Sequence, residues 1–129
     1  MILDSSAVIA IVFGEPGFEN MAVAMKSASS CAISAATLLE LSMVATSHGG
    51  DKAVLRCDTF LRSFGIAVEP FTEDQALIAR QAFSDFGKGR HPAALNFGDC
   101  FSYALSKSLG EPLLFKGDDF RKTDVTPAI

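Results

Sequence analysis

Short, uninterrupted runs of apolar residues alternate with helical segments along this chain of 129 residues. The runs expected to form strands are Met1–Leu3, Cys31–Ile33, Ile66–Phe71 and Leu113–Phe115. Strands that are apolar throughout, instead of alternating between apolar and polar residues, are typical of a parallel sheet covered on both faces. The chain therefore predicts an α/β fold, a three-layer α/β/α sandwich with a mostly parallel central sheet.

Capping and helix-breaking residues mark where the helices between these strands begin and end. Helices are expected at about Ser6 to Phe13, Phe18 to Lys26, Ala35 to Ser47, Asp51 to Phe64, from Thr72 onward, and Phe97 to Leu109. Gly49 and Gly50 separate the third helix from the fourth. Thr72 with Gln75 has the spacing of a capping box, in which two residues satisfy each other's backbone N–H groups. No linker or repeat interrupts the chain, so we expect one domain, residues 1–129.

Composition limits the kind of protein this can be. Fifteen acidic against eleven basic residues give a net charge of −4, which excludes binding to nucleic acid through a general positive surface. Three cysteines without a CxxC motif predict neither a disulfide framework nor a cysteine zinc site. The longest apolar run near the amino terminus, Ala7–Phe13, is too short to span a bilayer. We expect a cytoplasmic protein with no membrane partner and no nucleotide cofactor.

Acidic residues occur at four points where an α/β fold presents its functional site. Asp4 follows the first strand, Glu40 lies in the second turn of a helix, Asp99 is the third residue of another, and Asp118 and Asp119 follow the last strand. Since the carboxyl ends of parallel strands meet at one edge of the sheet, we expect these acids to share a pocket. Each acid taken alone also fits a structural role as a helix cap, a turn residue or part of a solvated helix face.

Carboxylates gathered in one pocket favour a bound cation. Two unit charges about 4 Å apart repel by about 4 kcal/mol near a protein surface unless a cation lies between them. Oxygen ligands favour Mg²⁺ or Mn²⁺ over zinc, and no His or Cys is placed to compete. An ion held in this way activates water and stabilises charge on a phosphoryl oxygen. The pattern therefore favours a divalent cation held by carboxylates, and with it metal-dependent hydrolysis of phosphodiester bonds.

Four segments of the chain carry a resemblance to a known family. They are MILDSSA at 1–7, ISAATLLE at 33–40, NFGDC at 96–100 and LFKGDDF at 114–120. In this order they resemble the PIN-domain ribonucleases and, more narrowly, the VapC toxins of type II toxin–antitoxin modules. The resemblance implies a PIN-like fold and a Mg²⁺- or Mn²⁺-dependent endoribonuclease that cuts RNA. It also implies a VapB-type antitoxin as partner and a homodimer.

The resemblance also implies roles for single residues. Asp4 and Asp99 match the primary metal ligands of the family, and Glu40 matches a carboxylate that binds metal directly or through water. Ser6 matches a small hydroxyl residue that orients the first acid or a water, so it is a candidate for contact with substrate.

Two residues are candidates for the last acid of the pocket. Family members often end the last strand with Thr-x-Asp-x-Asp-Phe, whereas this chain has FKGDDF at 115–120. Aligned without a gap, Asp119 takes the place of the second acid of that pattern. A shift of one residue gives the metal-facing role to Asp118 instead.

Basic residues near the acids are candidates for contact with the RNA backbone. Lys88 and Arg90 lie in the Gly-rich loop 87–96, where they would hold phosphates flanking the cut or simply belong to a solvated loop. Lys116 flanks the last acids and is a further candidate. His91, next to a proline in the loop, is expected to take no part in catalysis.

Two other functions fit parts of this pattern. A phosphatase with Asp4 as covalent nucleophile needs a second acid two residues later, where this chain has Ser6. A non-catalytic module would use the acids as helix caps and its apolar amino-terminal helices as a surface for dimerisation or antitoxin binding. Mn²⁺ binding and RNA cleavage distinguish these alternatives from a nuclease.

Overall fold

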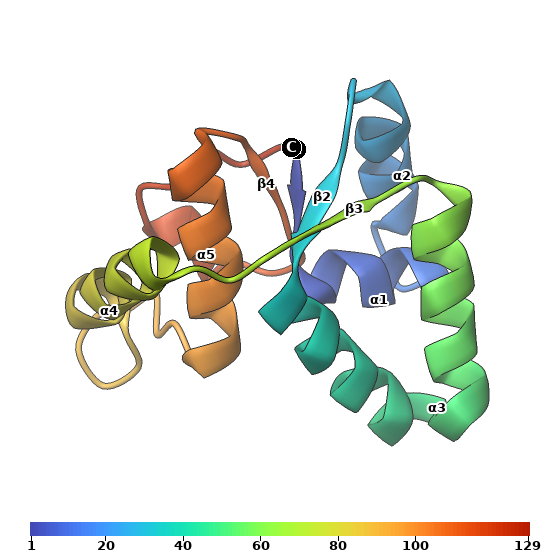
Figure 1. Ribbon diagram of the computed structural model, residues 1–129, viewed down its shortest axis with the longest axis horizontal. Helices are drawn as coiled ribbons and strands as arrows, with labels where there is room; N and C mark the ends of the chain where they lie inside the picture. Colours follow the sequence, from blue (N-terminus) through green and yellow to red (C-terminus); the bar gives the residue numbers. More distant parts are fainter.

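The centre of the molecule is a four-stranded parallel sheet, seen in a computed structural model that describes all 129 residues (Figure 1). Its strands are β1 (Ile2–Leu3), β2 (Ala32–Ser34), β3 (Ala67–Glu69) and β4 (Leu113–Leu114), in the order β3-β2-β1-β4. Ile2 lies between its partners Ala32 and Leu113. β1, β3 and β4 are shorter than the predicted runs, and β2 has the predicted length but begins one residue later. The strand order places β1 and the residue after it in the middle of the sheet.

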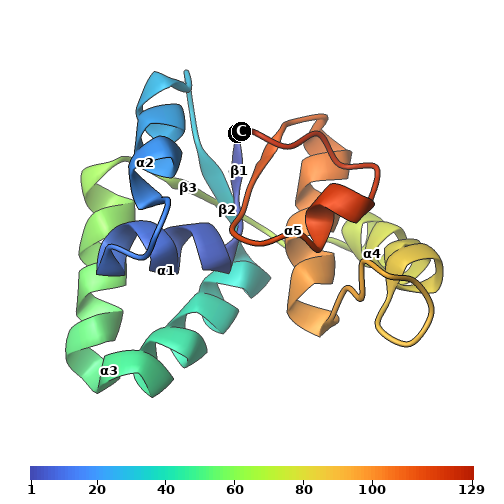
Figure 2. The ribbon, with the colours of Figure 1, turned by 180° about the vertical axis from the view of Figure 1, so that it is seen from behind.

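Helices cover both faces of the sheet. They are α1 (Ser5–Phe13), α2 (Phe18–Ser27), α3 (Ala35–Ser63), α4 (Glu73–Phe86) and α5 (Phe97–Leu109), followed by the short 3-10 helix η1 (Phe120–Lys122). Figures 1 and 2 show α1, α2 and α3 on one side of the sheet and α4 and α5 on the other. This arrangement confirms the predicted three-layer α/β/α fold.

Neighbouring strand residues point into opposite layers and build two separate hydrophobic clusters. Leu3 and Leu114 pack with the layer of α1 to α3, whereas Ile2 and Leu113 pack with α4 and α5. All four side chains are at most 1% exposed, as expected for a parallel sheet with both faces covered. β3 is the exception, because it is an edge strand and Val68 is 48% exposed. The prediction of a covered strand is wrong at this edge.

The break predicted at Gly49 and Gly50 divides α3 into two halves that meet at an angle (Figure 1). Gly50 has φ 67° and ψ −155°, a conformation that only glycine adopts readily. Ala53 and Cys57 of the second half belong to the cluster on the α1 side of the sheet. The break therefore lets the first half of α3 lead away from the carboxyl end of β2, while the second half turns back to pack on the α1 side of the sheet.

Side-chain caps fix the starts of the last two long helices. Asn96 and Asp99 form a full capping box: the Asp99 N–H donates to Asn96 Oδ1 at 2.9 Å, and the Asn96 N–H donates to Asp99 Oδ2 at 2.8 Å. Thr72 caps α4 by accepting from the Gln75 N–H at 3.2 Å. The Gln75 amide donates to the Pro70 carbonyl instead, so the second half of the capping box predicted there is not formed.

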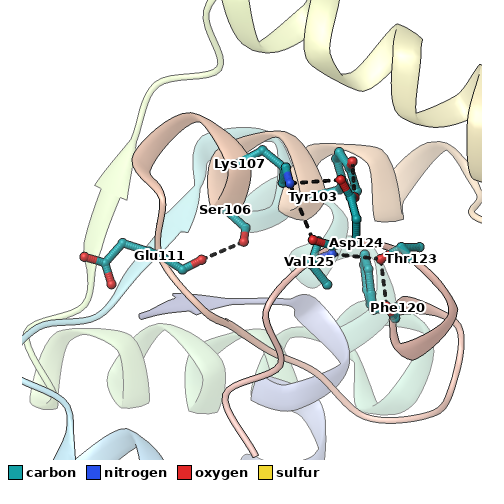
Figure 3. Close-up of polar contacts among 8 residues, drawn as sticks. All are labelled: Tyr103, Ser106, Lys107, Glu111, Phe120, Thr123, Asp124 and Val125. Carbon is teal, nitrogen blue, oxygen red and sulfur yellow. Dashed lines mark hydrogen bonds and ion pairs between the residues drawn. The ribbon is translucent and has the colours of Figure 1, made fainter.

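Polar contacts hold the carboxyl-terminal segment against α5 (Figure 3). The Tyr103 hydroxyl donates to Asp124 Oδ1 at 2.6 Å, and Lys107 forms an ion pair with the same carboxylate at 3.0 Å. The Leu113 N–H donates to the Thr126 carbonyl at 2.9 Å. The tail therefore lies beside β4 and adds a further extended segment to that edge of the sheet, which the sequence pattern did not indicate.

None of the helices has both the length and the apolar composition of a membrane-spanning segment. α1 and α2 reach that length and composition only when taken together, and their axes are bent by 112° relative to each other. All three cysteines are free thiols. Cys57 and Cys100 are buried, and Cys31 is partly buried.

Candidate active site

An acidic pocket of about 520 Å³ lies at the carboxyl ends of the central strands. Five carboxylates line it. Glu15, from the turn after α1, pairs with Lys116, and the other four are those of Asp4, Glu40, Asp99 and Asp119. These four come from the end of β1, the second turn of α3, the first turn of α5 and the loop after β4. The parallel topology thus brings together acids that are far apart in the sequence, at the edge of the sheet where we expected them.

Asp4 lies at the base of this pocket and is only 3% exposed. Its Oδ2 accepts hydrogen bonds from the backbone N–H of Ser6, at 3.0 Å, and from the Ser6 hydroxyl. Its Oδ1 accepts from the Ser102 hydroxyl at 2.6 Å. Asp4 is also the N-cap of α1. Asp4 therefore caps α1 and lines the pocket at the same time, because the start of α1 is itself one wall of the pocket.

Ser6 connects Asp4 to the loop after β4. While its hydroxyl donates to Asp4, it accepts from the Lys116 backbone N–H at 3.0 Å. Ser6 also lines the pocket. Its placement matches the predicted role of orienting the first acid.

Glu40 reaches the pocket from α3 and lies against the first turn of α5. Its Oε2 accepts from the Ser5 hydroxyl at 3.2 Å. A Cβ atom on Gly98 would overlap the Glu40 carboxyl group, so this approach requires glycine at that position. Burial, and then the charges of Asp4 and Asp99, raise the pKa of Glu40 to about 7 despite the hydrogen bond from Ser5.

Asp99 combines a capping role with a place in the pocket, as Asp4 does. Burial raises its pKa to about 6, with further contributions from the charges of Asp4 and Asp119, while the Asn96 N–H opposes the shift. A carboxylate in the first turn of a helix is stabilised by the helix dipole by about 0.3–1 kcal/mol. That stabilisation is too small to offset several neighbouring negative charges, so the pocket attracts cations.

Of the two final acids, the structure places Asp119 along the pocket. Asp118 is exposed and does not line it, and its carbonyl accepts from the Arg121 N–H at 3.1 Å. The placement therefore agrees with the alignment without a gap. Asp118, as the alternative fourth acid, has no contact with the pocket.

Lys116 is the one basic residue that lines the pocket, where it forms an ion pair with Glu15. Lys88 and Arg90 do not line it. Both are exposed in the loop between α4 and α5, and the Arg90 guanidinium lies 5.6 Å from the centre of the Phe83 ring. The structure therefore does not gather the predicted phosphate-binding residues into one group.

His91 has a structural role in the same loop. Its Nδ1 accepts from the Ala93 backbone N–H at 3.1 Å, and its ring lies edge-on to Phe86 at 5.3 Å. It does not line the acidic pocket. These contacts hold His91 within the loop, away from the acidic pocket.

The donor chemistry of the pocket suits a hard divalent cation. Its ionisable ligands are all carboxylates, with the Asn96 amide beside them and no His or Cys. No three of the carboxylates lie close enough together to enclose an ion. An open set of this kind fits Mg²⁺ or Mn²⁺, since Mg²⁺ usually keeps several waters and takes only one or two protein carboxylates.

Several residues of the site were not predicted from the sequence. Glu15 comes from the turn after α1 and carries no motif that would mark it. Gly98 precedes a predicted ligand, and its lack of a side chain was the available signal. Ser102 lies three residues after Asp99, on the same face of α5, and this i, i+3 spacing could have indicated it.

Comparison with known proteins agrees with this geometry. Residues 1–125 match the family model of the PIN domain, and the chain belongs to this family. Among its relatives is ribonuclease VapC42 of Mycobacterium tuberculosis, which is 43% identical over 129 residues, covering 99% of this chain and 98% of the relative.

Two solved structures share the fold at low sequence identity. One is VapC20 of Mycobacterium tuberculosis, described as a sarcin-ricin loop cleaving toxin, with a TM-score of 0.72, 20% identity and 98% of both chains covered. The other is VapBC2 from Rickettsia felis bound to a fragment of its promoter DNA, with a TM-score of 0.74, 14% identity and 98% and 95% of the two chains covered. Both support the three-layer architecture.

Proposed function

We propose that this protein is a metal-dependent endoribonuclease that acts as the toxin of a VapBC-type toxin–antitoxin pair. The observation that carries the proposal is the convergence of four carboxylates from β1, α3, α5 and the loop after β4 on one pocket. Similarity to VapC ribonucleases over nearly the whole chain supports RNA as the substrate and hydrolysis of phosphodiester bonds as the reaction.

Asp4 and Asp99 are the residues that would hold a Mg²⁺ or Mn²⁺ ion directly. Glu40 would bind the same ion directly or through water, and Asp119 would complete the acidic lining. The raised pKa values of Glu40 and Asp99 support this assignment, because a cation relieves the repulsion that contributes to them. When bound, such an ion supplies water activation and charge neutralisation at the phosphoryl group.

The remaining residues of the pocket bind and orient. Asp4 is held from two sides by Ser6 and Ser102, so its carboxylate is in place before a ligand arrives. Lys116 is placed to contact a phosphate of the RNA, and that phosphate would compete with Glu15 for its ammonium group. We assign to Lys88 and Arg90 only contacts with the RNA backbone outside the pocket.

We further propose a VapB-type antitoxin as partner, a homodimer as the working form and the cytoplasm as its location. The description of the Rickettsia felis structure as VapBC2 supports the antitoxin. Large apolar side chains left exposed support a protein partner: Leu39 and Met43 on α3 are each 64% exposed, and Phe97 on α5 is 80% exposed. Three free thiols suit a reducing compartment.

Asp4→Asn tests the proposed reaction. Asn is a good N-cap and has the same shape as Asp, so α1 should keep its start while the pocket loses the charge of its innermost ligand. The purified, partner-free protein should cut total cellular RNA, EDTA should stop it, and Asp4→Asn should lower the cleavage rate more than about 100-fold, since residues that merely support a metal ligand already contribute about 10- to 100-fold.

Asp119→Asn and Asp118→Asn form a matched pair for this assay. Both remove one carboxylate from the same loop, but only Asp119 lines the pocket. We expect a slower rate for Asp119→Asn and an unchanged rate for Asp118→Asn. Wild-type rates in Asp4→Asn would contradict the mechanism. No Mn²⁺ binding together with no RNA cleavage would indicate the non-catalytic module instead.

A further inference from the structure

Behind the acidic pocket, two hydroxyl groups are completely buried between α3 and α5. Thr37 and Ser102 are both 0% exposed, and their hydroxyl oxygens lie 3.2 Å apart. The Ser102 hydroxyl also lies 2.6 Å from Asp4 Oδ1. The three side chains therefore form a continuous buried chain of hydrogen bonds that ends on the innermost acid of the pocket.

The direction of this chain follows from the number of hydrogens. A carboxylate only accepts hydrogen bonds, so Ser102 must use its single hydroxyl hydrogen to donate to Asp4. Ser102 can then only accept from Thr37, which makes Thr37 the donor of the 3.2 Å contact. Each hydroxyl thus has one defined orientation.

The same counting shows which part of Asp4 is left for a ligand. A carboxylate offers about four acceptor positions, two on each oxygen. The Ser6 backbone N–H and hydroxyl occupy both positions on Oδ2, and Ser102 occupies one on Oδ1. One position on Oδ1 remains, on the same oxygen that Ser102 holds.

Helix register explains why the chain is built from these two residues. Thr37 lies three residues before Glu40 on α3, and Ser102 lies three residues after Asp99 on α5. Residues three apart lie on the same face of a helix. Each helix therefore contributes one carboxylate to the pocket and one hydroxyl to the support behind it, so the two helices and Asp4 are linked directly.

We propose that Thr37 and Ser102 are positioning residues that set the orientation of the Asp4 carboxylate for divalent-cation binding. Ser102 holds Oδ1 directly, and Thr37 holds Ser102 in the rotamer that does so. The inference rests on the proposed metal-dependent function. It adds to that function two residues that do not line the pocket and would otherwise be taken as ordinary buried polar groups of a helix contact.

Mn²⁺ titration of the metal-free protein by calorimetry tests this inference without using activity. Ser102→Ala should raise the dissociation constant of Mn²⁺ about tenfold, the scale seen when a residue that orients a metal ligand is removed. Ser106→Ala is the matched control, because Ser106 is a buried serine one turn further along α5 whose hydroxyl donates to the Glu111 carbonyl at 2.6 Å (Figure 3). It should leave the dissociation constant at the wild-type value.

Thr37 provides a second pair of variants. Thr37→Val keeps the branched shape and removes the hydroxyl, whereas Thr37→Ser keeps the hydroxyl and removes a methyl group. We expect Thr37→Val to weaken Mn²⁺ binding, by less than Ser102→Ala does, and Thr37→Ser to bind Mn²⁺ more tightly than Thr37→Val. Thermal unfolding of each variant checks that it is folded at the temperature of the titration.

The outcomes separate this inference from the proposed function. If wild-type protein binds Mn²⁺ and Ser102→Ala binds it as tightly as Ser106→Ala, the positioning role is wrong and the metal site stands. Equal affinity of Thr37→Val and Thr37→Ser would remove Thr37 from the chain of support and overturn the inference as stated. If wild-type protein does not bind Mn²⁺, the proposed function fails and the inference fails with it.

Discussion

Gly98 allows the Glu40 carboxylate to lie against the first turn of α5. A methyl group at this position would overlap the carboxyl group, which is the far end of a flexible side chain and can move away. Alanine is also a better helix former than glycine, by about 1 kcal/mol in a helix interior. We therefore expect Gly98→Ala to leave the free energy of unfolding unchanged or slightly higher while it weakens Mn²⁺ binding, as measured by denaturation and by calorimetry.

A double-mutant cycle shows whether this effect passes through Glu40. In a Glu40→Ala background the side chain that Gly98→Ala displaces is absent, so adding Gly98→Ala should weaken Mn²⁺ binding no further. An additional loss of affinity in the double variant would mean that Gly98 matters for some other reason. A clearly destabilised Gly98→Ala protein would contradict the expectation that the Glu40 carboxyl group moves aside without loss of stability.

Most acids of the pocket could be predicted at the level of single residues, but Glu15 and the hydroxyl groups that support Asp4 could not. Asp4 follows a strand, and Glu40 and Asp99 lie in the first two turns of helices, so the parallel topology brings all three to one edge of the sheet. Thr37 and Ser102 are 65 residues apart, and Ser102 is 98 residues from Asp4. Serine and threonine are common in helices, so their i, i+3 spacing from an acid becomes informative only once it is known which helix faces meet.

At the level of the secondary-structure elements, Gly50 carries the bend that lets α3 serve two purposes. Its φ of 67° and ψ of −155° lie in a region of backbone conformation that residues with a Cβ rarely adopt. Holding such a residue there costs about 1–3 kcal/mol. No atom lies within 4 Å of a Cβ added there, so the cost comes from the backbone and not from a clash. We expect Gly50→Ala to lower the free energy of unfolding by about that amount, measured by urea denaturation.

Lys52→Ala is a suitable control for this substitution. Lys52 is exposed on the same helix just after the bend, and its replacement should change stability by less than about 0.5 kcal/mol. Because Gly50 does not line the pocket, folded Gly50→Ala protein should bind Mn²⁺ like wild type. An unchanged free energy of unfolding in Gly50→Ala would show that the bend tolerates a side chain.

Helices were easier to predict than strand edges for a physical reason. Helix starts and stops are local events, and residues such as Asn96, Gly50 and Thr72 mark them within a few positions of the sequence. Whether a strand lies inside or at the edge of a sheet depends on distant partners. Val68 is therefore exposed although its run resembles a buried strand, and Thr126 pairs beside β4 although the tail has no strand pattern.

At the level of the whole molecule, the fold concentrates negative charge at one edge of the sheet. The chain carries a net charge of −4, and five of its carboxylates line one pocket. Each helix that starts at this edge contributes the positive end of its dipole, which favours an acid in the first turn but does not cancel repulsion between acids. The metal-free protein is therefore less stable than it would be without this cluster, and a cation is expected to restore the difference.

The pH dependence of unfolding should reveal the stability that the folded protein loses by burying these acids close to one another. The pKa of Glu40 is raised from 4.5 to about 7, and that of Asp99 from 3.8 to about 6. The folded protein therefore binds more protons than the unfolded chain between these values, and stability must fall as the pH rises through this window. The pKa of Asp124 is lowered from 3.8, so its contribution is lost only below that range and does not interfere. In EDTA, the unfolding temperature should fall between about pH 5 and about pH 8.

Saturating Mn²⁺ should reduce this fall, because bound cation favours the charged carboxylates, and the added stability should grow with pH. Glu40→Gln should also reduce the fall in EDTA, since it removes the titrating group with the higher of the two raised pKa values. Asp118→Asn, which removes an exposed acid outside the pocket, should keep the wild-type profile. A stability that rises across this pH range in EDTA would show that the acids of the pocket do not repel one another in the folded protein, and the reason for placing a cation among them would be lost.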